Sequence, residues 1–480
     1  MRRRAAIVVA ILAVVLPWGG AAHAYSLLTH EQLIDLTWKD SIVPLLLSRY
    51  PTLTPAELEQ ARAYAYGGCV IQDIGYYPFG DVAYSDLTHY VRSGDFVVNL
   101  FRNATNADEL AFAVGALSHY IGDSVGHAEA TNVAVPVEFP KLGVKYGKTV
   151  NFAQGQRQHI QTEFAFDINE IAHHRMAPVH YLRHIGLEVP VKQLALAFYQ
   201  TYGLNEDFTG TRGRRVNVKD YRFAVREFIP RIAYAITLLR RKHEPPDPNT
   251  PEAVELENET AAVAIENDWQ SYRRKAGIGT YTLAGLLFIV PKVGVLKMVD
   301  VKGPTAATEA EYMHSVTLST AELRRTLAGF TPPGGSQPTV ADKPAPVEAT
   351  KTQALPTHPV EATLLPKTEG PQQSRDPRHP LPNRDLDTGL EVQPGGYSLT
   401  DITYARLLHL LTRQPALPIP PGIKEDIEAY YADPNAPITT KKNPQQWAQV
   451  QADIATLNTM PTSTEPAPFL TYGNEADGAQ

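Results

Sequence analysis

The chain has 480 residues, of which 43% are hydrophobic and 20% are charged, and its net charge at pH 7 is −7. This composition supports a globular core. The acidic balance disfavours sequence-independent binding to nucleic acid, so we expect no stable nucleic-acid complex. With a single cysteine, Cys69, the chain cannot form an intramolecular disulfide.

Residues 1–24 have the pattern of a secretory signal. They begin with a basic segment, continue with an apolar run and end in Ala-His-Ala. This pattern predicts cleavage after Ala24 and a secreted or periplasmic protein that starts at Tyr25. Loss of the three arginines would move the net charge from −7 to about −10. The alternative is an uncleaved membrane anchor.

Residues 25–330 are predicted to form one helical domain. Thr29 and Gln32 have the spacing of a capping box, which predicts a helix over 31–47. A second helix is expected over 54–68, because this segment opens with Thr54-Pro55 and ends in two glycines that would stop it. Three further helices are expected at about 106–127, 152–175 and 219–244, the last stopped by Pro245-Pro246. Alternating apolar patterns are rare, so we predict an all-α fold.

Residues 278–290 form an apolar run, IGTYTLAGLLFIV. The run is shorter than the roughly 20 residues that a bilayer-spanning helix needs. It fits a buried core helix, and the alternative is peripheral contact with a membrane surface.

The composition changes after residue 330. Thirteen of the 66 residues in 331–396 are proline, which predicts a linker without fixed structure whose end, 381–399, docks as an ordered loop. Helical patterning returns over 397–460 as a small helical region, and 461–480 is predicted to be a disordered tail.

Three polar side chains are spaced four residues apart in the predicted helix over 106–127. Residues i, i+4 and i+8 project from one face of a helix, so His119, Asp123 and His127 share a face. The residues before them are largely apolar, which indicates a buried helix. Two imidazoles and a carboxylate are costly to bury without compensation, and a metal ion would provide it.

More potential metal ligands lie within the first 140 residues after the predicted cleavage site. His159 and Glu163 are again four apart and share a helical face. His30, Asp73 and His89 precede the central helix. Imidazole and carboxylate form a donor set that zinc prefers, and the lack of cysteine pairs disfavours a thiolate site.

The order of these residues resembles that of the zinc-dependent phospholipase C family, which shares its fold with the single-strand-specific zinc nucleases. The family has a free N-terminal residue, a nearby His, an Asp, a His, a His-x3-Asp with a later His, and a His-x3-Glu or His-x3-Asp. Nine positions over about 25–175 follow this order: Tyr25, His30, Asp73, His89, His119, Asp123, His127, His159 and Glu163.

The resemblance implies a multi-helix bundle with about three zinc ions in a cleft. The first ion would be bound by Asp73, His89, His119 and Asp123. The second would be bound by His30, Asp123 and the α-amino nitrogen and carbonyl oxygen of Tyr25, so that Asp123 bridges two ions. The third would be held by His127, His159 and Glu163. An α-amino group at Tyr25 exists only after cleavage, which would tie activity to export.

The chain departs from the family pattern at several positions. Tyr25 replaces the usual Trp, a change that backbone ligation tolerates. The gap from Asp123 to His127 is two residues shorter than usual. Ile74 and Asp86 occupy positions that are aromatic in the choline pocket of characterised phospholipases, which removes the basis for assigning a choline headgroup. An aromatic wall of different origin, Tyr76, Tyr77 and Phe79, remains an alternative.

The leading functional hypothesis is a secreted zinc phosphodiesterase that hydrolyses a phospholipid headgroup ester by metal-activated water, with phospholipid or another phosphodiester as its substrate. Asp73 is the candidate for orienting or deprotonating that water. One alternative is a zinc nuclease or 3′-nucleotidase that acts on single-stranded nucleic acid. Another is a non-catalytic, metal-stabilised binding protein of the envelope.

Overall fold

The computed structural model describes residues 26–77, 80–206, 208, 218–240, 248, 250–289, 300–330, 378–432 and 442–463. Residues 1–24 and Tyr25 lie outside the described residues, as do Phe79, residues 331–377 and residues 464–480. The predictions of a signal segment, of most of the linker and of most of the tail therefore concern parts of the chain that the structure does not describe.

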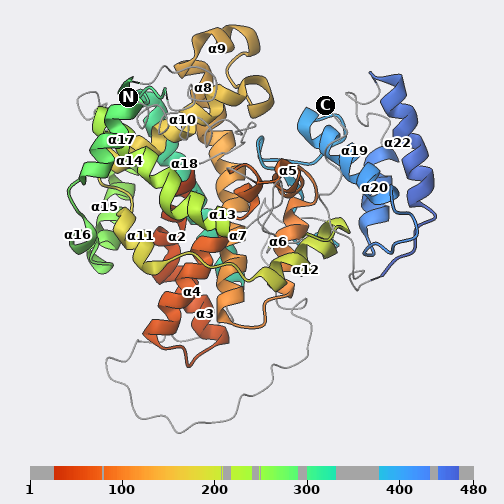
Figure 1. Ribbon diagram of the computed structural model, residues 1–480, viewed down its shortest axis with the longest axis horizontal. Coiled ribbons are helices and arrows are strands. Elements are labelled where there is room, and N and C mark those ends of the chain that lie inside the picture. Colours follow the sequence, from red (N-terminus) through yellow and green to blue (C-terminus); the bar gives the residue numbers. More distant parts are fainter. Residues whose placement is uncertain are drawn as a thin grey trace, which may run out of the picture.

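Helices dominate the described part of the chain, as the all-α prediction required (Figure 1). The first half contains α2 (Leu27–Thr37), η1 (Trp38–Ile42), α3 (Val43–Arg49), α4 (Pro55–Gly68), η2 (Gln72–Gly75), α5 (Val82–Tyr90), α6 (Ser93–Arg102), α7 (Ala107–Gly126), η3 (His127–Thr131), α8 (Asn132–Glu138), α9 (Pro140–Tyr146), α10 (Phe152–Ala172), α11 (Val179–Ile185) and α12 (Val191–Tyr202). The second half contains α13 (Val218–Phe223), η4 (Ala224–Phe228), α14 (Ile229–Arg240), α15 (Pro251–Glu266), α16 (Trp269–Tyr272), α17 (Ile278–Ile289), α18 (Ala306–Phe330), β1 (Arg384–Asp385), β2 (Leu390–Glu391), α19 (Ser398–Thr412), α20 (Ile423–Ala432) and α22 (Pro444–Leu457).

The long helix α7 runs through the middle of the molecule and packs most closely against α4 (Figure 1). Their backbones approach at small residues. A Cβ on Gly68 would lie 2.1 Å from the carbonyl oxygen of Phe112, and a Cβ on Gly115 would lie 2.2 Å from that of Ala65. Gly68 was predicted to stop this helix, and α4 does end at Gly68; the glycine also allows the close approach of α7.

Two of the π-helical turns precede a proline. In η1, the backbone N–H of Val43 bonds the carbonyl oxygen of Trp38, one residue before Pro44. Pro230 follows η4 in the same way. Proline has no N–H and its ring clashes with the carbonyl four residues earlier, so the wider turn keeps the helix continuous. The helix predicted over 31–47 is therefore one continuous helical run, made up of α2, η1 and α3.

The capping box predicted at Thr29 is wrong. The helix starts at Leu27 with Ser26 as its N-cap residue. Thr29 lies inside the first turn, where its hydroxyl donates a 2.7 Å hydrogen bond to Asp167 on α10. A tertiary contact has replaced the local one. At α4 the local signal holds, because Thr54 and Glu57 form a complete capping box.

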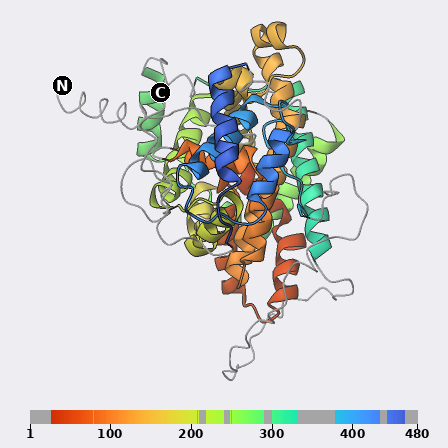
Figure 2. The same ribbon diagram turned by 90° about the vertical axis from the view of Figure 1, so that its right-hand side faces the viewer.

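The C-terminal helices α19, α20 and α22 form a small group at one side of the molecule, on the right in Figure 1 and facing the viewer in Figure 2. The two short antiparallel strands β1 and β2 connect this group to α5 and α6. Residues 378–396, predicted as the end of the linker, thus have defined structure. Their docking agrees with the expectation for 381–399.

Helix α17 coincides with the apolar run 278–290. One face packs Ala284 and Leu287 against α10 and α14 in a small apolar cluster. The opposite face exposes Ile278, Phe288 and Ile289, at 87%, 77% and 78%. Among the residues that the structure describes, no helix combines the length and apolar character needed to cross a bilayer.

Candidate metal centre

The eight described residues predicted as ligands come together in the interior. Their side chains are at most 1% exposed although all are polar or charged: His30, Asp73, His89, His119, Asp123, His127, His159 and Glu163. They come from α2, η2, α5, α7, η3 and α10. Burying so many ionisable groups is unfavourable unless they are compensated, so this concentration indicates a binding centre.

The first group of donors lies between η2, α5 and α7. Nε2 of His89 is 3.3 Å from Oδ1 of Asp73, 3.3 Å from Oδ2 of Asp123 and 3.4 Å from Nε2 of His119. His119 Nε2 is 3.1 Å from the same Asp123 oxygen and 3.9 Å from Asp73. Donors about 2.0–2.2 Å from one tetrahedral zinc ion lie roughly 3.3–3.6 Å apart, so this group has the spacing of a zinc site.

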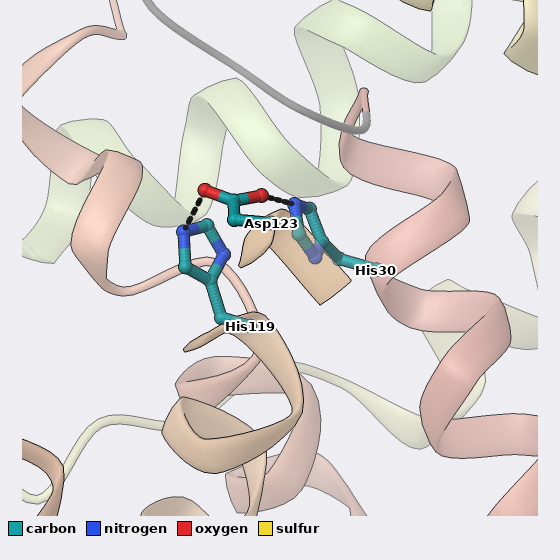
Figure 3. A group of neighbouring side chains, drawn as sticks. All are labelled: His30, His119 and Asp123. Carbon is teal, nitrogen blue, oxygen red and sulfur yellow. Dashed lines mark ion pairs between the residues drawn. The ribbon is translucent and has the colours of Figure 1, made fainter. Parts of the chain in front are cut away.

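The second group shares Asp123 with the first. Its Oδ1 is 3.2 Å from Nε2 of His30, while its Oδ2 faces His119 (Figure 3). The rings of His30 and His119 stack with centroids 4.2 Å apart. Asp123 therefore directs one oxygen toward each group, as a bridging carboxylate would. Tyr25, predicted to complete the second group, is outside the described residues.

The third group consists of His127, His159 and Glu163, whose donor atoms lie within 4.8 Å of one another. Nδ1 of His159 is 3.3 Å from Oε1 of Glu163. His127 is the first residue of the π-helical turn η3, which directly follows α7. Such turns often occur at functional sites. The gap between Asp123 and His127 is shorter than the usual family pattern, yet His127 still groups with His159 and Glu163.

Backbone carbonyls orient three of the imidazoles. Each ring directs one nitrogen to a carbonyl oxygen and the other to its donor group, an arrangement that is typical of metal-binding histidines because it fixes the neutral tautomer. The contacts are His89 Nδ1 to Ser85 O at 2.7 Å, His119 Nδ1 to Cys69 O at 3.0 Å, and His159 Nε2 to Val150 O at 2.8 Å.

The pKa values of these groups show what burial costs without a cation. Burial lowers the pKa of His159 to about 4 and that of His127 well below its usual range, so both rings are neutral and able to bind metal at pH 7. Burial, followed by repulsion from Asp123, raises the pKa of Glu163 well above its usual range. A nearby cation would restore its charge.

The carboxylates of the first group act on His89 in the opposite direction. Burial opposes a charge on this ring, but hydrogen bonds that it donates to Asp123 and Asp73, and attraction to both carboxylates, raise its pKa well above the usual range. Burial also opposes the charge of Asp123, whose pKa is nevertheless lowered well below its usual range by His119 and by hydrogen bonds from the surrounding imidazoles. The charges of His89 and Asp123 thus stabilise each other in the buried first group.

The residues fit zinc. His127 Nδ1 and Nε2 and Glu163 Oε2 are buried without a hydrogen-bond partner. Buried polar atoms are nearly always satisfied, so unsatisfied donors that converge in one place point to an absent partner. Neutral imidazole and carboxylate are ligands that zinc accepts.

The family comparison extends over this region. Residues 29–204 match the family model described as zinc dependent phospholipase C. The match covers just over a third of the chain and includes all eight described donors, which confirms the family recognised in the sequence. Neither curated proteins nor solved structures give a match.

Ile74, Asp86 and Tyr77 pack and form an ion pair near the first donor group. Ile74 is buried in the main core at 1% exposure. Asp86 accepts a 3.1 Å hydrogen bond from the Tyr76 hydroxyl and lies 3.7 Å from Arg406 of α19, and burial raises its pKa to about 6. Tyr77 is also buried and stacks on Tyr221. Ile74 and Tyr77 thus contribute to packing, and Asp86 forms an ion pair with α19.

Sequence reasoning missed one acidic side chain beside the third group. Asp387, in the turn between β1 and β2, places Oδ1 3.5 Å from Nε2 of His127. The motif RDLDTG that contains it also reads as an ordinary turn, and it lies more than 200 residues beyond Glu163. Only the folded structure distinguishes it from other acidic turn residues.

Proposed function

We propose that the protein is an exported zinc-dependent phosphodiesterase of phospholipase C type, which hydrolyses a phospholipid between glycerol and phosphate. The observation that carries the proposal is the convergence of eight buried donors into three adjoining groups. The match of residues 29–204 to the zinc-dependent phospholipase C family model supports the same conclusion. About three zinc ions are expected.

Zinc, when bound, supplies Lewis acidity, which lowers the pKa of water from roughly 15.7 toward about 7 and offsets the negative charge of a phosphodiester. Asp123 sets the separation of the first two donor groups, since one oxygen faces each. Oδ1 of Asp73 lies close to Nε2 of His89 in the first donor group. We assign Asp73 the task of orienting the attacking water, because a carboxylate that also binds a cation is a weak base.

Export would generate the last ligand. Cleavage after Ala24 frees the α-amino group of Tyr25, which binds metal when neutral. His30 is buried beside Asp123 and is the described residue nearest in sequence that could share an ion with it. An unprocessed chain is therefore expected to bind less zinc than the processed one.

A membrane surface is the expected site of action. The exposed face of α17 carries Ile278, Tyr281, Phe288 and Ile289 without a charged residue. Apolar side chains of this kind insert into the boundary between headgroups and acyl chains. The net charge of −7 favours zwitterionic over strongly anionic lipid and disfavours nucleic acid.

The test compares two substrates in parallel. The purified protein is incubated with vesicles of mixed phospholipids and with single-stranded DNA, each with and without a chelator, and zinc is then restored. We expect release of phosphorylated headgroups that the chelator abolishes and zinc restores. Hydrolysis of DNA alone would identify a nuclease, and zinc binding without hydrolysis of either would indicate a binding protein.

A pair of variants links the activity to the centre. Asp123→Asn removes the charge of the bridging carboxylate and should lower both zinc content and hydrolysis by at least tenfold. Glu129→Gln removes an exposed carboxylate from η3, two residues after His127, and should change neither. Equal activity of the two variants would contradict the proposed site.

A further inference from the structure

We propose that Asp387 is a fourth protein ligand of the third zinc site, supplied by the C-terminal segment to the group formed by His127, His159 and Glu163. The inference rests on zinc binding in the proposed function but not on the identity of the substrate. Asp387 lies far outside the region of family similarity, residues 29–204.

Two tyrosines fix the direction of the Asp387 carboxylate. Its Oδ2 accepts hydrogen bonds from the hydroxyls of Tyr90, at 2.9 Å, and Tyr397, at 2.5 Å. Its Oδ1 is then directed at His127 and has no hydrogen-bond partner, although the side chain is fully buried. One oxygen is held by neutral donors and the other is left for a cation, which is how a ligating carboxylate is usually supported.

The separation between Asp387 and His127 favours coordination over a hydrogen bond. A charge-assisted hydrogen bond between nitrogen and oxygen is about 2.7–2.9 Å long. Oδ1 of Asp387 is 3.5 Å from Nε2 of His127. This value resembles the 3.3 Å between His159 and Glu163 in the same group. Roughly 3.3–3.6 Å is the spacing of two ligands on one tetrahedral zinc ion.

The turn that carries Asp387 is fastened to the metal-binding helices. The backbone N–H of Leu386 donates to the carbonyl oxygen of His89 at 3.1 Å. The side-chain amide of Asn132, directly after η3, donates to the carbonyl oxygen of Asp387 at 2.9 Å. Leu386 is itself fully buried. Asp387 is thus held between α5 and η3 on a backbone with little freedom to withdraw.

A fourth protein ligand would change the role of the third ion. Catalytic zinc sites keep three protein ligands and one open position, whereas sites with four protein ligands are closed and structural. With Asp387, the third site would have four protein ligands and would become a closed, structural site. The C-terminal segment would then be part of the metal centre.

The experiment measures zinc release from the purified intact protein. Zinc content is determined by mass spectrometry, and release to a coloured chelator is followed in time for wild type, Asp387→Asn and Glu391→Gln. Glu391 is the matched control, because it is an exposed carboxylate of the same hairpin. We expect one zinc ion to leave Asp387→Asn at least tenfold faster than wild type, and Glu391→Gln to behave as wild type.

A second measurement does not depend on the folding of a variant. An anomalous-scattering map of wild-type crystals at the zinc edge should place Oδ1 of Asp387 about 2.0–2.2 Å from the third ion. A distance above 3 Å, or unchanged release from a folded Asp387→Asn, overturns the inference while leaving the phosphodiesterase proposal intact. A wild-type protein without zinc overturns both. Zinc bound as expected without phospholipid hydrolysis overturns only the activity.

Discussion

The carboxylate of Asp167 accepts hydrogen bonds from both the backbone N–H and the hydroxyl of Thr29, at 3.2 and 2.7 Å. Its other oxygen accepts from the backbone N–H of Leu28 at 3.1 Å. A buried acid on α10 thus satisfies the first turn of α2, where the amide groups have no partner within the helix. His30 follows Thr29 directly, so this contact also sets the position of a predicted zinc ligand.

Asp167→Ala is expected to destabilise the fold and loosen the second donor group. The backbone N–H of Leu28 loses its acceptor, whereas the N–H of Thr29 keeps the carbonyl oxygen of Ser26 and its hydroxyl keeps Tyr312. One buried donor left unsatisfied should lower the free energy of unfolding by about 1–3 kcal/mol. Asp167→Asn keeps one carbonyl acceptor and should cost less. Denaturant titration measures the stability and elemental analysis the zinc content. Wild-type stability of the Ala variant would show that the acid does not anchor α2.

Gly389 illustrates how tightly the hairpin β1–β2 approaches α7. It has φ +70°, and a Cβ at this position would lie 2.2 Å from the carbonyl oxygen of Ser124, the residue after Asp123. Gly389→Ala should therefore displace the hairpin and lower the free energy of unfolding by about 2–4 kcal/mol. Thermal and denaturant unfolding provide the measurement.

Gly147→Ala is the matched control for that substitution. Gly147 also has positive φ, +98°, but a Cβ at this position would meet no atom within 4 Å. The substitution should cost only the backbone strain, about 1–3 kcal/mol. If both variants lose the same stability, steric contact with α7 is not what constrains Gly389.

His379 joins the C-terminal helices to the core through two carboxylates. Its Nδ1 lies 2.9 Å from Asp95 of α6 and its Nε2 lies 3.2 Å from Asp426 of α20, while Arg92 contacts both acids at 2.9 Å. Hydrogen bonds that His379 donates to Asp426 and Asp95 raise its pKa to about 10. The imidazole and the two acids could also be read as a metal site, but two cationic side chains already balance the acids.

The direction of the pH effect follows from the raised pKa. The folded protein holds the His379 proton more tightly than the unfolded chain, whose pKa is about 6.5. The stabilisation is fully present below pH 6.5, declines as the pH rises and is lost above about pH 10. His379→Asn should lower the free energy of unfolding by about 1–3 kcal/mol near pH 6 and by much less near pH 10. Denaturant titrations of both proteins across this range measure the difference, and a constant difference would refute the assignment.

The sequence predicted the helical donors well because their spacing carries geometric information. His159 and Glu163 are one turn apart on α10, and the structure brings their donor atoms together. For Asp73 and His30, spacing alone says little, and only the order shared with a family linked them to the helices. Which residues bind zinc remains a prediction that the proposed variants test.

What the sequence could not predict depends on long-range contacts. Thr29 has the pattern of a helix cap, yet its hydroxyl donates a hydrogen bond to Asp167, which is 138 residues away in the sequence. Gly68 ends α4 as its pattern predicts, but the pattern does not reveal the close approach of α7 at this residue. Asp387 has no pattern of its own, because its role comes from Tyr90 and Tyr397. In each case a tertiary partner determined the outcome.

The exposed face of α17 gives a prediction about the membrane. Phe288→Asp replaces a side chain that is 77% exposed and packs little against the protein, so the fold should tolerate it. Transfer of a phenylalanine ring into lipid contributes roughly 1.5–3 kcal/mol. Its loss should therefore weaken binding to phospholipid vesicles about 10- to 100-fold, as measured by vesicle sedimentation. Hydrolysis of a soluble short-chain phosphodiester should be unchanged.

Ile402→Asp is the control for that substitution. Ile402 is 51% exposed on α19, a helix that lies on the opposite side of the molecule from α17 in Figure 1. The variant introduces the same charge at an apolar position, so an effect of charge alone would weaken vesicle binding equally in both variants. A selective loss in Phe288→Asp would place α17 at the lipid surface. Equal binding by Phe288→Asp and wild type would show that α17 does not contact the membrane and serves only to pack against α10 and α14.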